Sequence, residues 1–230
     1  MSTELPTVVV LPGLDGTGLL SESFSRGDWH GHHVLVVPLP REGPQDYPAL
    51  AALIATRLPA GRLILIGESF SGPLAMRLAK SQGARVSALV IVGGFCASPA
   101  PVGLALMPLR PLFLLKPPSR LVRRFLVGPD ASREMVDAVT SAVRSVPSAT
   151  LTERARVVLT LKEDDCPTFN ALPILLIQAR QDALLPWDAQ SQLERHFPDA
   201  ESVWIESPHL LLATRTRECR SAVLEFLQRL

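Results

Sequence analysis

Cysteine is scarce in this sequence, and the few cysteines present form no recognised pattern. The chain of 230 residues contains Cys96, Cys166 and Cys219, an odd number without C-x-x-C spacing. Disulfide frameworks normally use an even number of cysteines, and thiolate zinc sites need closely spaced pairs. We therefore expect neither of them, and we expect free thiols in a reducing, cytoplasmic compartment.

The sequence also lacks an excess of charge of one sign. It has 23 basic and 22 acidic residues, a formal net charge of +1. This balance excludes a strongly basic nucleic-acid-binding protein and a strongly acidic solvating chain. A mean hydropathy of +0.23 with 20% charged residues excludes global disorder.

Long apolar runs are absent as well. No apolar stretch reaches about 18 residues without proline or charge, so we expect no transmembrane segment. The apolar run near the N-terminus is short and has no basic region before it, so we expect no signal peptide.

Six short apolar runs, rich in Val and Ile, are the most regular feature that is present. They cover residues 7–11, 34–37, 63–66, 89–92, 174–177 and 202–205. Such runs are typical of strands buried on both faces. Helical patterns lie between them at residues 48–58, 72–82, 186–196 and 216–230. The alternation predicts an α/β fold with a mostly parallel six-stranded sheet and helices on both faces.

The alternation stops between residues 98 and 170, where only helical patterns occur. Four helices are expected there, at residues 104–115, 119–127, 132–146 and 149–162. We therefore predict a core built from residues 1–97 and 171–230 and an inserted helical cap, or lid, at residues 98–170. We expect the apolar stretch 102–115 to line an acyl pocket or to pack the cap on the core.

The end of the third apolar run carries the clearest chemical signal. In open parallel sheets, ligands bind beyond the carboxyl ends of the strands. The third run continues as Gly-Glu-Ser-Phe-Ser-Gly, from Gly67 onward, before a helix begins. A nucleophilic serine on a tight strand-to-helix turn needs small residues two positions before and after it. Gly67 meets this need for Ser69, and Ser71 stands where the usual G-x-S-x-G motif has its second glycine.

A serine nucleophile needs a base and a group that orients this base. His209 follows the sixth run, and Asp182 follows the fifth. The other four histidines are expected at the opposite end of the sheet or on the surface. The order Ser69, Asp182, His209 is the one expected for a nucleophile on this elbow. Asp188 and Glu206 are alternatives for the acidic member.

An oxyanion that forms during ester cleavage needs two backbone N–H donors. We expect them from Phe70, directly after the serine, and from Leu14 in the glycine-rich loop after the first run. The spacing of this loop, G-x-x-G-x-G, fits neither the dinucleotide nor the P-loop pattern, so a nucleotide site is not expected. Asp15 is expected to brace the loop.

Together, the Pro-Gly loop, the elbow at Ser69, Asp182 and His209 resemble the α/β-hydrolase fold superfamily over nearly the whole chain. The phrases LPGLDGTG and GESFSG are similar to small serine esterases and acyltransferases. They are more loosely similar to pimeloyl-acyl-carrier-protein methyl ester esterases. The sheet of this superfamily commonly has eight strands, and the first two have no counterpart among the six expected here. The resemblance implies ester hydrolysis through an acyl-serine intermediate.

Basic residues accumulate in the predicted cap. Residues 98–170 contain ten basic and seven acidic residues, whereas the remainder of the chain is net acidic. Five of the basic residues follow one another without an acid between them: Arg110, Lys116, Arg120, Arg123 and Arg124. Such a patch can steer an acidic acyl carrier protein. A solvated cap surface or contact with a membrane surface are the alternatives.

We therefore predict a serine carboxylic-ester hydrolase that acts on a small or medium acyl ester, with a carrier-linked acyl methyl ester as one candidate. Two alternatives remain open. One is an acyltransferase that uses the same three residues, and the other is a ligand receptor of slow turnover, which a distortion of the elbow by Ser71 would favour. We expect no cofactor, no metal and no nucleic-acid partner.

Overall fold

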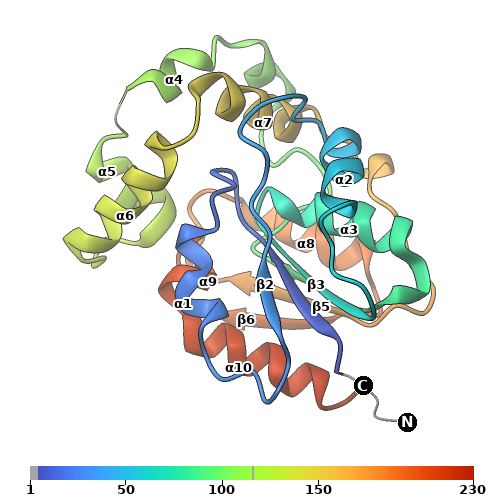
Figure 1. Cartoon of the computed structure of the whole chain (residues 1–230). Helices are drawn as coiled ribbons and strands as arrows, with labels where there is room; N and C mark the ends of the chain where they lie inside the picture. Colours follow the sequence, from blue (N-terminus) through green and yellow to red (C-terminus); the bar gives the residue numbers. More distant parts are fainter. Residues whose placement is uncertain (1–4, 116) are drawn as a thin grey trace.

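One fully parallel sheet organises the chain. A computed structural model describes residues 5–115 and 117–230, and the sheet runs through its centre (Figure 1). The strand order is β2-β1-β3-β4-β5-β6, and every neighbouring pair is parallel. The strands are β1 (Thr7–Leu11), β2 (Val34–Val36), β3 (Leu63–Glu68), β4 (Val86–Val92), β5 (Ile174–Ala179) and β6 (Glu201–Ile205). The predicted α/β fold and all six predicted strands are confirmed.

The burial of the strands explains why the apolar runs located them. β3 and β5 are buried along their whole length, whereas the edge strands β2 and β6 are only partly buried. β4 begins three residues before the predicted run, because its backbone pairing with β3 continues past the polar Ser87. An apolar pattern therefore marks the buried part of a strand and underestimates its hydrogen-bonded length.

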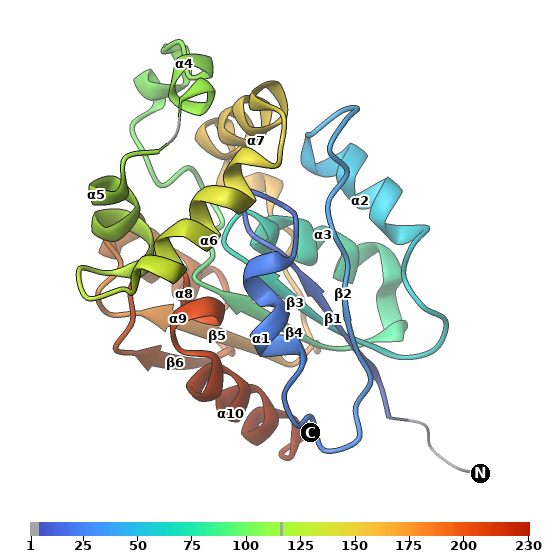
Figure 2. The same ribbon diagram turned by 60° about the vertical axis from the view of Figure 1, so that its left-hand side comes forward.

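Helices cover both faces of the sheet, as Figure 2 shows. On one face, side chains of the strands pack with α2 (Tyr47–Ala55), α3 (Ser71–Gln82) and α8 (Trp187–His196). On the other face they pack with α1 (Glu22–Ser25), α9 (Leu211–Thr214) and α10 (Thr216–Leu227). Alternate strand residues point to opposite faces, so Val9 and Leu11 join the first core and Val8 and Val10 the second. The sequence did not predict α1 and α9, because four residues are too few to show a helical period.

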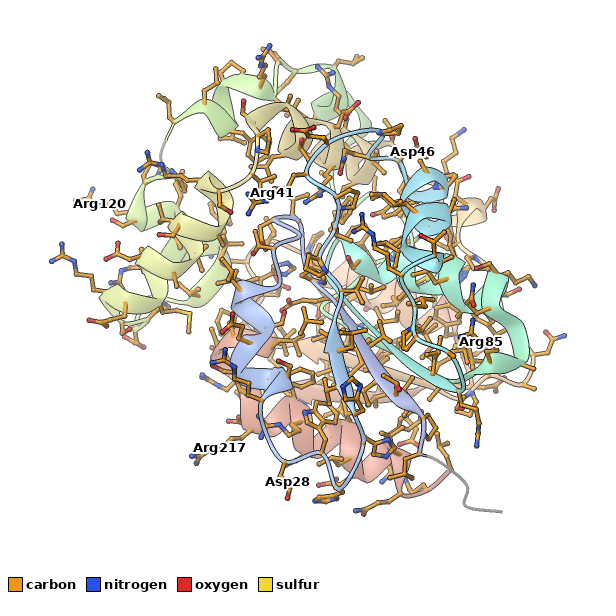
Figure 3. All side chains as sticks on the ribbon, in the orientation of Figure 1. Asp28, Arg41, Asp46, Arg85, Arg120 and Arg217 are labelled. Atoms are coloured by element: carbon orange, nitrogen blue, oxygen red, sulfur yellow. The ribbon has the colours of Figure 1, made fainter. Side chains whose placement is uncertain are left out.

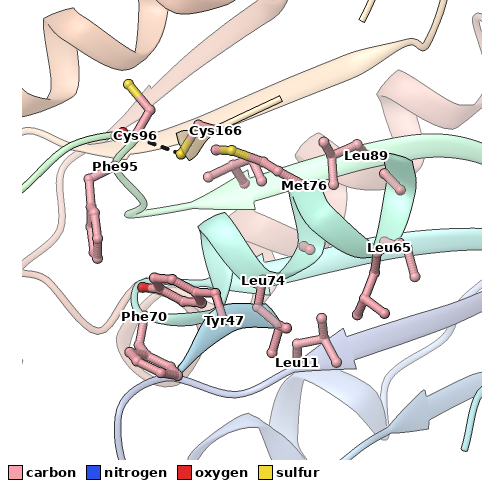
Figure 4. Close-up of a cluster of buried hydrophobic side chains, with 14 of the residues drawn as sticks. Leu11, Tyr47, Leu65, Phe70, Leu74, Met76, Leu89, Phe95, Cys96 and Cys166 are labelled. Atoms are coloured by element: carbon pink, nitrogen blue, oxygen red, sulfur yellow. Dashed lines mark hydrogen bonds between the residues drawn. The ribbon is translucent and has the colours of Figure 1, made fainter. Parts of the chain in front are cut away.

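The first core reaches from the sheet to the aromatic residues beside the elbow. Figure 4 shows Leu11 and Leu74 near Phe70 and Tyr47, whose rings stack with their centroids 5.1 Å apart. Two of the cysteines lie in the same core, and the Cys166 thiol donates a hydrogen bond to the carbonyl of Cys96 over 3.2 Å. Burial raises the pKa of both thiols to about 12, so both stay protonated at neutral pH.

Between β4 and β5 the described residues form helices and turns without a strand. The elements are η3 (Val102–Leu106), α4 (Arg110–Leu114), α5 (Ser119–Val122), the π-helix η4 (Arg123–Val127), α6 (Arg133–Arg144), α7 (Ser148–Thr160) and η5 (Glu163–Asp165). Helices α4 to α7 lie together beyond one end of the sheet in both views (Figures 1 and 2). α7 also contributes Val157 and Val158 to the first core. Two further short elements, η1 (Leu19–Ser21) and η2 (Gly83–Arg85), lie elsewhere in the fold.

The expectation that the apolar stretch 102–115 packs the cap on the core was wrong. Most of its large side chains whose burial is described are exposed, with Leu106 at 89% and Leu115 at 75% exposure, and among these only Leu109 is buried. Pro108 and Pro111 divide the stretch into short turns, so it cannot present one continuous apolar face to the core. Within residues 5–115 and 117–230, no helix has both the length and the hydropathy that a membrane crossing requires.

Candidate active site

The order of the strands brings two loops together at the carboxyl end of the sheet. The chain leaves β1 toward β2 on one side and returns in β3 on the other side, with Leu11 opposite Gly67 in register. Loops that diverge at such a reversal leave a crevice between them. The loop after β1 passes close to the elbow, since a Cβ placed on Gly13 would lie 3.9 Å from the Cβ of Ser69.

Ser69 has the backbone conformation of a nucleophile elbow. Its φ is +50°, in the left-handed region that non-glycine residues rarely adopt. The turn closes so tightly that a Cβ on Gly67 would collide with the carbonyl of Ser71. Glycine is therefore required at position 67, and Ser69 is held at the start of α3, whose N-terminus favours negative charge.

Ser71, the departure from the usual motif, fits without disturbing the turn. Its side chain is fully buried, and its hydroxyl donates a hydrogen bond of 2.5 Å to the carbonyl of Pro12. This bond fastens the elbow to the loop after β1. The geometry therefore removes the argument that Ser71 distorts the elbow.

The three residues expected to act together form one hydrogen-bonded chain. The Ser69 Oγ lies 2.9 Å from His209 Nε2, and His209 Nδ1 lies 2.7 Å from Asp182 Oδ2. An ionised carboxylate only accepts hydrogen bonds, so Nδ1 carries the ring proton and Nε2 is free to accept one from the serine. The imidazole and the carboxylate are almost completely buried, with side-chain exposures of 2% and 0%.

Backbone amides hold Asp182 in place, and the two alternative acidic residues, Glu206 and Asp188, are exposed. The second oxygen of Asp182, Oδ1, accepts hydrogen bonds of 2.8 Å from the amides of Leu184 and Leu185. Glu206 is exposed and pairs with Arg180 instead, over 3.4 Å. Asp188 is exposed in the first turn of α8. Asp182 is therefore the acid that orients His209.

Gly93, at the end of β4, lies beside Leu211 and His209. Its φ of +52° favours glycine, and a Cβ there would lie 3.0 Å from Leu211 Cδ1 and 3.4 Å from the carbonyl of His209. In the sequence this glycine marks only the end of a strand. Its contact with the histidine depends on a chain separation of more than a hundred residues, so no local pattern reveals it.

The two amides expected to bind an oxyanion are available. Neither the N–H of Leu14 nor that of Phe70 donates a hydrogen bond within the described parts of the chain. Asp15 braces the loop as expected, because its Oδ1 accepts bonds from both the amide, at 2.9 Å, and the hydroxyl of Thr17. The loop is thus held in shape while the Leu14 amide stays free.

Arg154, in the predicted cap, is a neighbour that the sequence did not single out. It is fully buried, and its Nη1 donates a 2.8 Å hydrogen bond to the carbonyl of Leu14. Helices usually carry arginine on exposed faces, and the spacing within α7 does not distinguish this one. The sequence gives no signal for its burial, because Glu153 and Arg156 lie beside it in α7 and the segment shows no clear apolar face at this position.

Glu68, directly before the nucleophile in the sequence, is another buried ionisable group. The residue is only 3% exposed, and Oε1 of its carboxyl has no hydrogen-bond partner among the described residues. Burial raises the pKa of this carboxyl to about 7, the charge of His209 lowers it, and that of Asp15 raises it further. Glu68 therefore changes charge near neutral pH next to the hydrogen-bonded chain.

The predicted docking residues are not members of the Ser69–His209–Asp182 hydrogen-bonded chain, but three of them line a cavity beside it. Arg120, Arg123 and Arg124 line a cavity of about 420 Å³ together with Gln181 and Pro208, the residues that precede Asp182 and His209. Arg110 is exposed on α4. Lys116 lies outside the described residues.

One further group could offer metal ligands. Cys96, Glu163 and His196 bring three ligand atoms within 4.8 Å of one another. His196 Nδ1 and a Glu163 carboxylate oxygen already lie 3.5 Å apart. None of the three belongs to the hydrogen-bonded chain of Ser69, His209 and Asp182.

The fold and this arrangement agree with the comparison to known families. The family model described as "Alpha/beta hydrolase family" matches residues 8–221. The chain therefore belongs to the alpha/beta hydrolase family.

Several solved structures share the fold. An esterase from Exiguobacterium antarcticum superposes with a TM-score of 0.80 at 13% identity, over 98% of this chain and 92% of that one. A thermophilic esterase from Thermogutta terrifontis gives 0.79 at 16% identity, over 98% and 90%. A bromoperoxidase from Bacillus anthracis gives 0.77 at 17% identity, over 97% and 92%. Identities this low establish the shared fold alone.

The raised pKa of Glu68 predicts how stability depends on pH. Folding holds a proton on Glu68 that the unfolded chain releases near the ordinary glutamate pKa of 4.5. The corresponding stabilisation is complete at low pH and is lost as the pH rises toward the folded-state pKa of about 7. Glu68→Gln should remove this loss, which amounts to roughly 3 kcal/mol at most. Urea unfolding at pH 5 and pH 8 measures it.

The exposed Glu225 of α10 provides the control. Glu225→Gln should leave the difference between the two pH values as it is in the wild type. An unchanged difference in Glu68→Gln would contradict the assignment.

Proposed function

We propose that this protein is a serine carboxylic-ester hydrolase. The observation that carries the proposal is the hydrogen-bonded chain from Ser69 through His209 to Asp182, with distances of 2.9 and 2.7 Å, beside two free amides. A hydroxyl is a weak nucleophile at its own pKa, so this alignment with a base is what gives Ser69 its reactivity. Membership of the alpha/beta hydrolase family supports the same reaction class.

In the acylation step, Ser69 attacks the carbonyl carbon of the ester. The Oγ–C bond forms while the hydroxyl proton moves to Nε2 of His209, and the carbonyl electron pair moves onto oxygen. The amides of Leu14 and Phe70 bind this oxyanion. Asp182 stabilises the imidazolium through Nδ1.

Collapse of the intermediate breaks the bond to the alcohol oxygen. His209 returns its proton from Nε2 to the leaving alcohol, and the acyl group remains on Ser69. Water then enters, gives a proton to His209 and attacks the acyl carbon, and the second collapse releases the acid and restores the serine hydroxyl. Every proton transfer in this scheme uses Nε2, whose geometry Asp182 and its two amide partners fix.

The proposed substrate is a small or medium acyl ester, with the segment 98–170 as a cap over the core. A cytoplasmic location fits the three free, buried cysteines, since a reducing compartment leaves thiols unpaired.

The arginines of α5 and η4 support a second, finer proposal, that the ester is presented by an acidic acyl carrier protein. No acidic residue occurs between Glu68 and Asp130 in the sequence. Arg123 is committed to the carbonyls of Pro129 and Ala131, which leaves Arg120 and Arg124 as the charges available to a partner. Arg120 projects from α5 at the edge of the molecule (Figure 3).

The first test is hydrolysis of a p-nitrophenyl ester series from acetyl to long chain. The wild type should release p-nitrophenol and free acid, and Ser69→Ala should lower kcat by about 10⁴-fold or more, because the nucleophile is lost. Ser81→Ala, at the other end of α3, is the matched control and should retain activity. No turnover by the wild type would contradict the proposal. Transfer of the acyl group to an added alcohol in preference to water would identify an acyltransferase.

The second test separates carrier docking from chemistry. Arg120→Gln/Arg124→Gln should lower kcat/KM for a carrier-linked ester on the order of tenfold at low salt, because steering by opposite charge is lost. The same variant should keep its activity on p-nitrophenyl acetate within about twofold, since no reacting group changes. Arg62→Gln/Arg217→Gln removes two exposed charges elsewhere and serves as the control. Equal losses on both substrates would count against docking.

A further inference from the structure

Arg154 connects the predicted cap to three segments of the core. It belongs to α7, it is fully buried, and all three of its bonding nitrogens are engaged. Nη1 donates to the carbonyl of Leu14 over 2.8 Å, Nη2 to the carbonyl of Pro40 over 2.7 Å, and Nε to Oε1 of Gln45 over 2.9 Å. The first acceptor lies in the loop after β1, and the other two lie between β2 and α2.

Packing alone does not account for a charged side chain at this position. None of the three acceptors is a carboxylate, so the guanidinium is solvated by backbone and amide oxygens. Burying a charge is costly, and an apolar side chain of similar volume is often at least as stabilising. α7 already packs on the core through Val157 and Val158. Burial lowers the pKa of Arg154 to about 10, so the charge persists at neutral pH.

The same guanidinium contacts both residues that carry the free amides, Leu14 and Phe70. It bonds the carbonyl of Leu14, and it lies 5.9 Å from the centre of the Phe70 ring. The loop closes tightly around it, because a Cβ on Gly16 would collide with Nη1. Gly16 also has a φ of +67°, which favours glycine. Arg154 thus contacts both the loop after β1 and Phe70, the residue after Ser69.

We propose that Arg154 is a positioning residue that keeps the Leu14 and Phe70 amides aimed at one point, so that a tetrahedral intermediate on Ser69 finds both donors in place. This inference rests on the proposed ester hydrolysis. Donors placed in advance stabilise the transition state more than the bound substrate. Loss of this positioning should therefore lower kcat rather than raise KM.

A consequence concerns the cap. α7 cannot lift from the core without drawing a fully buried guanidinium out of three hydrogen bonds. These bonds therefore hold α7 against the core.

The test compares Arg154→Met and Arg154→Lys with the wild type. Arg154→Met keeps much of the volume and removes every donor, so kcat on a p-nitrophenyl ester should fall about 10- to 100-fold while KM stays within about threefold. The affinity for a trifluoromethyl ketone, which forms a hemiketal oxyanion on serine, should fall by the same factor as kcat. Arg154→Lys keeps one donor and should recover part of both. Titration of active sites with a fluorophosphonate corrects for any misfolded fraction.

Arg85→Met is the matched control. Arg85 also donates to backbone carbonyls, those of Gly61 and Pro59, and it lies on the opposite side of the molecule from Arg120 (Figure 3). It should leave kcat unchanged. A folded Arg154→Met with kcat within about threefold of the wild type, or with a raised KM and unchanged kcat, would overturn the inference.

If Arg154→Met does not fold, Gln45→Leu tests the positioning role instead, because it removes only the acceptor of the Arg154 Nε hydrogen bond. A kcat lowered about threefold or more, with an unchanged melting temperature, supports the positioning role. An unchanged kcat overturns it. Wild-type turnover and labelling of Ser69 test the proposed function separately, so the failure of one is distinguishable from the failure of the other.

Discussion

The left-handed backbone of Ser69 is the constraint on which the rest of the candidate site depends. A φ of +50° on a serine is unfavourable, and it persists only because the surroundings fix it. Gly67 lacks the side chain that would collide with the turn, and the hydroxyl of Ser71 ties the turn to Pro12. With this turn in place, α3 begins two residues after Ser69, and the loop after β1 lies beside the serine.

Two buried charges flank this turn, and they differ in how they are satisfied. Glu68 has an unpartnered oxygen and is close to Ser21 and Leu212, on the face covered by α1, α9 and α10. Arg154 is bonded through three nitrogens and lies beside Phe70, on the face covered by α2 and α3. Burial favours the neutral form of the Glu68 carboxyl, whereas the Arg154 guanidinium stays charged at neutral pH. Both stand next to groups that the proposed reaction uses.

The strands and the three residues of the hydrogen-bonded chain could be predicted from the sequence. The buried strands appeared as apolar runs, and Ser69, Asp182 and His209 followed from their positions after those runs, because parallel strands end at one edge. What escaped were contacts that depend on tertiary structure, namely Gly93 against His209, the hydrogen bond from Ser71, and Arg154 under the loop. The exposed stretch 102–115 was misjudged for a related reason. Apolar composition predicts burial only where a regular element can present one face, and two prolines prevent that here.

Covalent labelling tests most directly whether Ser69 is a nucleophile activated by His209. The protein would be incubated with a fluorophosphonate, digested and analysed by mass spectrometry, beside a His209→Gln variant. We predict a single adduct on the peptide that contains Ser69, formed rapidly in the wild type and at least about 100-fold more slowly without the imidazole. Labelling at another residue, or an equal rate in the variant, would contradict it.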